Sequence, residues 1–197
     1  VERFLPEAKC LAEFLVENGY HTVYIGGASG SFAGKENFLS QHGFREVRDV
    51  TYFKNELDLP ETAFSGWGVY DDQLLKSVHD EFVRLSHRKQ PFALFALTID
   101  THHPHGYISP SCNGLNYSDG KTKTLNALYC TDRLVSRFID KIVNSPYYDD
   151  TTLVVMSDHL AMINDAHALL SPAEQRAILL MIFAPQLPAG EQQAAAT

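Results

Sequence analysis

Three histidines and one Asp-His pair are the residues of this sequence whose types and spacing could do chemistry. His102, His103 and His105 follow the apolar run "PFALFALTI", and Asp158 and His159 follow the run "TTLVVM". A carboxylate beside an imidazole can offer one oxygen and one nitrogen to a divalent cation, a mixed set that suits manganese, zinc or iron. The pattern therefore raises the hypothesis of a metal site with a second polar group nearby.

Plainer explanations exist for both groups. An Asp-His pair after a strand is often a helix cap beside a polar loop residue, and a histidine-rich loop is often only exposed to solvent. Residue types alone leave these alternatives open. The metal-site hypothesis gains support over these alternatives only if the fold brings the histidines and the Asp-His pair close together.

The elements that would position these residues alternate between helix and strand. We expect helices at about 6–19, 34–42, 71–86 and 123–143, and strands at 21–27, 91–99, 151–158 and 177–185. The first helix has an apolar stripe of Leu11, Phe14 and Leu15. The apolar positions of the last helix are Leu128, Leu134, Val135, Phe138, Ile139 and Ile142.

The alternation predicts an α/β fold with a mostly parallel sheet and helices on both faces. The run "PFALFALTI" is apolar at almost every position, which is typical of a strand covered on both sides. In open α/β sheets, ligands bind beyond the carboxyl ends of the strands. If the strands before His102 and Asp158 are near neighbours, both groups reach the same rim of the sheet.

Composition limits the class of protein. The chain has 197 residues, 45% of them hydrophobic, and a net charge of -8, so one globular domain is expected and a nucleic-acid surface is not. No apolar run reaches the roughly 18 residues that a membrane span needs, so we expect a soluble segment. The chain begins with Val1 and has no signal peptide, so we expect an excerpt of a longer protein.

The three cysteines, Cys10, Cys112 and Cys130, show no CxxC spacing, which argues against a zinc knuckle or a thioredoxin-type site. Cys112 and Cys130 could close a loop as a disulfide in an oxidising compartment. Buried free thiols are the alternative, and the sequence alone does not choose between them.

Three segments carry a family resemblance. In this order, "GGASGSFAGKENFLSQHGF", "TIDTHHPHGYISPSC" and "SDHLAM" resemble the sulfatase-like phosphoglycerol transferases of the alkaline phosphatase superfamily. Within that family, the chain is most similar to the branch of phosphoglycerol transferases that act on osmoregulated periplasmic glucans. Lipoteichoic acid synthases are related to this branch. The similarity runs from about Pro6 to Pro185 and implies an alkaline phosphatase/sulfatase-like fold that is incomplete at both ends.

The resemblance implies roles for matching residues only. The Asp and His of the "DH" step are metal ligands in such enzymes, which implies Asp158 and His159 here. The His two residues before the Pro of "HxP" contacts the transferred phosphate group, which implies His102. His103 and His105 are assigned to the substrate side without an equally defined role. The implied metal is Mn²⁺ or Mg²⁺, with Zn²⁺ less favoured.

One segment departs from the family pattern. Related synthases place a Trp and an Arg around the glycerol phosphate in the segment that matches "SFAGK", where this chain has Ala33 and Lys35. Lys35 can offer a positive charge to phosphate, but as a point charge without the fork of an Arg. Ala33 would leave that wall of the pocket open.

The resemblance also implies a missing nucleophile. The family's Thr nucleophile and a further acidic metal ligand lie in an upstream βα segment, and this chain is expected to begin after it. Cys10 lies in "CLAEF", which lacks the "CxPxR" context of a sulfatase nucleophile. We therefore interpret residues 1–189 as a partial catalytic domain and 190–197 as a tail, assign no catalytic residue, and expect this fragment to be inactive.

For the intact parent, the resemblance implies a metal-assisted double displacement. Phosphoglycerol would pass from a phosphatidylglycerol-type lipid headgroup to the enzyme and then to periplasmic glucan. The parent would be membrane-anchored at the periplasmic face of the bacterial inner membrane, where Cys112 and Cys130 are free to pair. Two alternatives stay open: a hydrolase of the sulfatase or phosphodiesterase type, and a non-catalytic relative that binds glucan or lipid headgroup.

Overall fold

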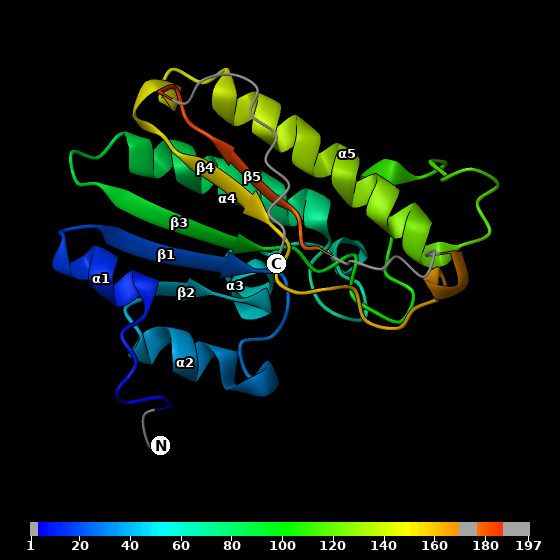
Figure 1. Ribbon diagram of the computed structural model, residues 1–197, viewed down its shortest axis with the longest axis horizontal. Coiled ribbons are helices and arrows are strands. Elements are labelled where there is room, and N and C mark those ends of the chain that lie inside the picture. Colours follow the sequence, from blue (N-terminus) through cyan, green and yellow to red (C-terminus); the bar gives the residue numbers. More distant parts are fainter. Residues whose placement is uncertain (1–3, 170–176, 187–197) are drawn as a thin grey trace.

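Three parallel strands form the central sheet of the computed structural model, which describes residues 4–169 and 177–186 (Figure 1). The order is β2 (Glu46–Arg48), β1 (His21–Gly26) and β3 (Phe92–Leu97). β1 pairs in parallel with both neighbours, so that Val23 lies opposite Glu46 on one side and Leu94 on the other. The expected parallel sheet is confirmed for these strands.

Helices lie on both sides of this sheet, as expected. They are α1 (Leu11–Glu17), α2 (Lys35–Gln41), α3 (Val50–Asn55), α4 (Asp71–Ser86) and α5 (Lys123–Val143). α1 lies in front of the sheet in Figure 1, whereas α3 and α4 cover the opposite face and α5 packs on α4. Short 3-10 turns occupy Phe32–Gly34, Glu61–Ala63, Pro110–Cys112, Tyr148–Asp150 and His167–Leu169.

The core lies between β1 and the helices α3 and α4. Its fully or nearly fully buried members are Val23, Ile25, Phe53, Val69, Leu74, Val78 and Leu85. The α4 members recur at helical spacing, which gives this long helix one apolar face toward the sheet. This packing fixes the carboxyl ends of β1 and β3 relative to the first turn of α4.

The other two strands depart from the expected arrangement. β4 (Leu153–Met156) and β5 (Leu180–Phe183) exist as predicted, but they form an antiparallel pair outside the three-stranded sheet. Because β3 bonds only to β1 among the described residues, it is half-buried and Ala96 is exposed, so the expectation of burial on both faces was wrong for this strand. Apolar composition predicts a strand but not its neighbours.

Two helical stripes were also misjudged. α1 begins at Leu11, not near Pro6, and it exposes Leu11 and Phe14 while it buries Ala12. The reason is a close approach to Gly43, where an added Cβ would lie 2.5 Å from the backbone nitrogen of Glu13. In α5, Leu128 is likewise exposed.

A disulfide joins Cys112 to Cys130, which confirms the pairing. This bond ties the 3-10 turn Pro110–Cys112 to α5. Among the described residues, no helix is both long and apolar enough to cross a membrane.

Candidate functional site

The loop after β3 carries the three histidines and is closed by its own backbone. His102 N donates to Ile99 O, Gly106 N donates to His102 O, and Tyr107 N donates to Asp100 O, at 3.0, 3.0 and 2.6 Å. These bonds make the loop a compact turn and hold His102 directly beyond the end of the strand.

His102 and His103 lie together. Their rings stack with centroids 4.7 Å apart, and His102 Nδ1 lies 2.9 Å from His103 O. A carbonyl can only accept a hydrogen bond, so Nδ1 carries the proton in this contact. The other ring nitrogen, Nε2, has no hydrogen-bond partner within residues 4–169 and 177–186, which leaves it available to a ligand.

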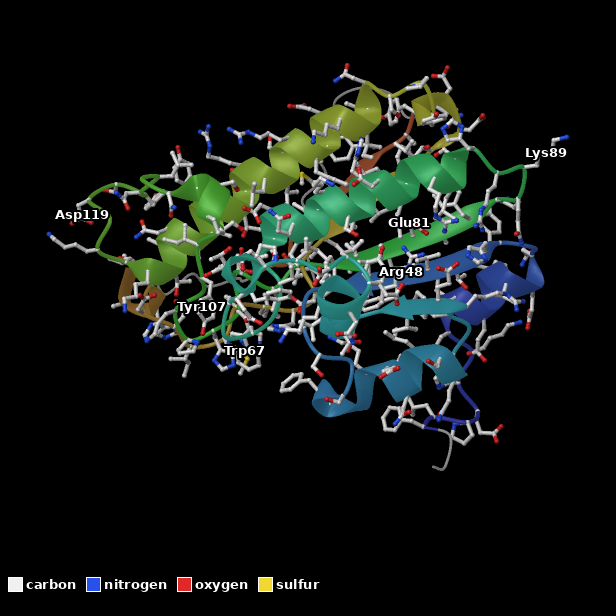
Figure 2. All side chains as sticks on the ribbon, turned by 180° about the vertical axis from the view of Figure 1, so that it is seen from behind. Arg48, Trp67, Glu81, Lys89, Tyr107 and Asp119 are labelled. Carbon is white, nitrogen blue, oxygen red and sulfur yellow. A yellow bond between two sulfur atoms is a disulfide. The ribbon has the colours of Figure 1, made fainter. Side chains whose placement is uncertain are left out.

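Trp67 is a site residue that sequence reasoning missed. Its indole ring lies against His102 with centroids 3.9 Å apart, and Phe32 meets it edge-on at 5.6 Å. Figure 2 shows Trp67 beside Tyr107, at the end of the molecule opposite Lys89. The available signal was a single tryptophan between two glycines in "SGWGVYDD".

Two buried acids support the base of the histidine loop. The Asp71 carboxylate accepts from Ile99 N and Asp100 N, whereas Asp100 Oδ2 accepts from Asp71 N and from the Ser109 hydroxyl at 2.5 Å. Burial first, and then the neighbouring Asp71 charge, raise the pKa of Asp100 to about 7. Burial also raises the pKa of Asp71. Asp100 and Ser109 thus clasp the two ends of the loop.

His105 lies apart from the other two histidines. Its Nδ1 is 3.8 Å from Asp165 Oδ2, and Asp165 accepts from the backbone nitrogens of Lys123 and Thr124 at the start of α5. The Thr124 hydrogen bond lowers the pKa of Asp165. His105 therefore lies beside the first turn of α5.

Lys35 begins α2 and faces the end of β1. Its ammonium lies 5.9 Å from the centre of the Tyr24 ring and interacts with the charge of Asp49, which holds Gly30 N at 2.7 Å. Partial burial lowers the pKa of Lys35, with the Asp49 charge opposing the shift. In the described part of the chain, no hydrogen bond or ion pair joins Lys35 to the histidines.

Asp158 and His159 follow β4 and are both about 60% exposed. His159 Nδ1 lies 2.8 Å from Leu160 O, an acceptor, so Nδ1 carries a proton, and in the neutral ring Nε2 is the nitrogen with the lone pair. That nitrogen lies 3.5 Å from Asp158 Oδ2. One imidazole nitrogen and one carboxylate oxygen with open surroundings fit a divalent cation, and the carbonyl bond is the usual second contact of a metal-bound histidine.

The strands before these groups point the same way. In Figure 1, β1, β3 and β4 all end on the same side of the molecule. The segments that carry Lys35, His102 and the Asp158–His159 pair therefore start from the same side of the molecule, although, among the described residues, β4 is not hydrogen-bonded to the sheet that contains β3. Within the described ranges, no hydrogen bond or ion pair connects the pair to the histidine loop.

A hollow of about 240 Å³ lies elsewhere, between α3 and α4, and none of the predicted site residues lines it. Glu81 forms part of its wall and is paired with Arg48 and Arg84, with nitrogen–oxygen distances of 3.0 and 2.7 Å. Hydrogen bonds to these arginines lower the pKa of Glu81 against the effect of burial. The ion pair between Arg48 of β2 and Glu81 of α4 joins these two elements (Figure 2), and the paired charges point to a structural role.

Cys10, Glu13 and His42 form another group of possible ligands, with one donor atom each within 4.8 Å of the others. His42 is fully buried, and its ring nitrogens already contact Glu13 Oε2 at 3.0 Å and Phe4 O at 2.6 Å. These contacts join α1 to the end of α2 and lie on elements other than those that carry the histidine loop.

Comparisons with known proteins agree with the fold. The sulfatase family profile matches residues 5–196. Phosphoglycerol transferase I of Xanthomonas axonopodis pv. citri is 46% identical over 93% of this chain and 27% of its own length, and that of Escherichia coli is 39% identical over 92% and 24%. The chain thus spans about a quarter of the length of the curated relatives it matches.

Two solved structures share the architecture. A Vibrio parahaemolyticus protein of the alkaline phosphatase superfamily has a TM-score of 0.69 and 27% identity, covering 90% of this chain and 41% of that one. A lipoteichoic acid synthase of Listeria monocytogenes has a TM-score of 0.73 and 18% identity, covering 91% and 47%. The second likeness shows the fold alone.

Proposed function

The chain belongs to the sulfatase family, and on that premise we propose that it forms part of the catalytic domain of a phosphoglycerol transferase. The parent protein moves phosphoglycerol from a phosphatidylglycerol-type lipid headgroup to periplasmic glucan. The observation that supports this most is the open His159 Nε2 beside Asp158 Oδ2, at the end of a strand that points the same way as the strand before His102.

Asp158 and His159 are the proposed ligands of a divalent metal, Mn²⁺ or Mg²⁺. When bound, such an ion lowers the pKa of a coordinated hydroxyl and neutralises charge on phosphoryl oxygens. Oxygen-rich coordination favours manganese or magnesium, and the imidazole nitrogen favours manganese of the two. The remaining ligands come from parts of the parent outside residues 1–197.

His102 is the proposed phosphate-binding residue. Its Nδ1 proton is donated to the carbonyl of His103, so Nε2 is the ring nitrogen left for a ligand, and in the imidazolium form it donates to a phosphoryl oxygen. A donor aimed at the place where charge develops stabilises the transition state more than the ground state. His103 orients the ring through its stack, Lys35 offers a positive charge to phosphate, and His105 lies on the substrate side.

The reaction is a double displacement. A Thr hydroxyl, supplied by the parent outside residues 1–197, attacks phosphorus while the bond to the glycerolipid oxygen breaks, and that oxygen takes a proton and leaves as diacylglycerol. A glucan hydroxyl then attacks the phosphoglycerol-enzyme, forms the new phosphodiester and frees the Thr oxygen, which recovers a proton.

The proposed location is the periplasmic face of the bacterial inner membrane, with the parent membrane-anchored. The Cys112–Cys130 disulfide supports this location, because such bonds persist in oxidising compartments and are rare in the cytosol. The same face gives access to both a lipid donor and a periplasmic glucan.

The full-length protein tests the proposal. Incubated with Mn²⁺ and phosphatidylglycerol vesicles, it should release diacylglycerol, and phosphoglycerol should appear on added glucan. Release of glycerol phosphate to water with no transfer to glucan would identify a hydrolase instead. Binding of glucan or vesicles without release would identify a non-catalytic relative.

A further inference from the structure

The contact between Trp67 and His102 joins two different loops. The ring centroids are 3.9 Å apart with a tilt of 43°, and Trp67 is the only tryptophan of the chain. His103 also contacts the His102 ring, with its centroid 4.7 Å away. Two aromatic neighbours therefore restrict the imidazole that we assign to the phosphoryl group.

Trp67 is held by the end of β1 and not by the histidine loop. Gly68 pairs with Ala28 in an isolated β-bridge, and Val69 N donates to Gly27 O at 3.0 Å. A Cβ added to Gly68 would lie 2.0 Å from Gly27 O, so only glycine fits there. The indole thus starts from a backbone segment that is anchored to the residues directly after β1.

The placement of Trp67 differs from that of a core tryptophan. Its side chain is only half-buried, and its ring partners are His102 and Phe32, which is itself 55% exposed. The ring is not among the residues of the buried cluster that contains Val69. Instead, the ring lies at the surface with an imidazole against it.

We propose that Trp67 is a positioning residue for His102, a role that rests on the proposed function. Van der Waals contact with the indole limits the rotation of the imidazole about its side-chain bonds. Trp67 acts through His102 and does not need to touch the reacting atoms.

The first test uses steady-state kinetics of diacylglycerol release by the full-length protein. Trp67→Leu removes the aromatic face and should lower kcat roughly tenfold to hundredfold, the scale of misoriented catalytic groups, while KM for the lipid stays the same. Trp67→Phe keeps an aromatic face and should restore most of kcat. An unchanged kcat in a folded Trp67→Leu protein would overturn the proposal.

Tyr147→Leu is the matched control. Tyr147 also packs on a histidine, His87, with ring centroids 5.5 Å apart and its hydroxyl 3.1 Å from Nε2, but at the far end of α4. Removing this ring should leave kcat close to wild type. If Tyr147→Leu lost as much kcat as Trp67→Leu, the effect would be general destabilisation and the positioning role would be rejected.

The second test needs no activity, so it stands even if the proposed function fails. In the 197-residue chain, all tryptophan fluorescence comes from Trp67, and a protonated imidazole in contact quenches indole emission. Lowering the pH from about 8 to about 5 protonates histidines and should quench the emission. His102→Gln should remove this quench, whereas His103→Gln, whose ring contacts His102, should keep it.

Each result of the fluorescence test either supports or contradicts the contact between Trp67 and His102. A quench that is absent from wild type, or that survives His102→Gln, would show that the indole does not report on His102 and would overturn the proposal. Loss of the quench in His102→Gln, with normal fluorescence anisotropy and circular dichroism, would support it. The fluorescence test could support the contact while the wild-type full-length protein releases no diacylglycerol. That combination would reject the proposed function but not the Trp67–His102 pair.

Discussion

Asp71 and Asp100 each accept a hydrogen bond from the backbone N–H of the other, at 3.0 Å from Asp71 N to Asp100 Oδ2 and 3.3 Å from Asp100 N to Asp71 Oδ2. Both residues are fully buried, and Asp100 Oδ1 has no hydrogen-bond partner among the described residues. Two buried carboxyl groups this close cannot both ionise cheaply. Below the raised pKa of Asp100 the pair therefore holds a proton, and its hydrogen bonds fix the end of β3 to the start of α4.

This pair predicts that stability falls as pH rises. Burial raises the pKa of Asp100 to about 7, whereas an unfolded Asp titrates near pH 4. Between these values the folded chain binds the extra proton, so the free energy of unfolding should decrease by up to about 1.4 kcal/mol per pH unit. Urea titrations from pH 4 to pH 8 measure this slope, and Asp100→Asn should flatten it. An equal slope in Asp100→Asn would assign the effect to other groups.

The disulfide should stabilise the chain substantially. Cys112 and Cys130 are 18 positions apart, and closing a loop of that length contributes about 3 kcal/mol by restricting the unfolded state. Cys112→Ser should therefore lower the melting temperature, and non-reducing mass spectrometry of periplasmically produced protein should show the linked peptides. Cys10→Ser, which removes the free thiol, is the control and should leave the link in place.

Gly68 should not tolerate a side chain. Its φ of +149° and the 2.0 Å distance from an added Cβ to Gly27 O predict that Gly68→Ala costs at least about 2 kcal/mol in stability. Gly19→Ala is the matched control, because Gly19 also has a positive φ, +85°, but no atom within 4 Å of an added Cβ. Its cost should be about 1 kcal/mol, that of the backbone conformation alone. Equal melting temperatures for the two variants would contradict this account of the Ala28–Gly68 bridge.

Substitutions in the full-length protein should distinguish the residues that bind the metal from the residue that binds phosphate. Asp158→Ala, His159→Ala and His102→Ala should each abolish Mn²⁺-dependent release of diacylglycerol, because each removes a proposed ligand of the metal or of the phosphoryl group. Calorimetry should show weakened Mn²⁺ binding for the first two variants and normal binding for His102→Ala. The control is His167→Ala, in an exposed 3-10 turn after β4. Retained activity in Asp158→Ala would refute the metal site.

Residues 1–197 alone should be inactive. Asp158 and His159 are the two metal ligands that we propose within the described residues, and both are exposed, so Mn²⁺ should bind weakly to this chain. Diacylglycerol release should be undetectable with this chain at any Mn²⁺ concentration. Turnover by the isolated chain would mean that it contains its own nucleophile and that the site assignment is wrong.

The sequence by itself determined the long elements and the local groups. α4 and α5 have the predicted bounds, 71–86 and 123–143, because an apolar periodicity repeated over several turns is compatible with a helix and with no other element. The strands before the chemical residues were also predicted, since their apolar runs are bounded by polar loops. Short elements such as β2 and α3 were missed because few residues carry their signal.

Only the tertiary structure decided which residues meet. β4 and β5 pair with each other in antiparallel fashion, a choice that backbone hydrogen bonding makes and apolar side chains do not encode. Trp67 reaches His102 because the Ala28–Gly68 bridge carries its loop to the end of β1 while β3 ends beside it. Such contacts depend on the packing of three separate segments, and no periodicity within any one of them predicts where its side chains will lie.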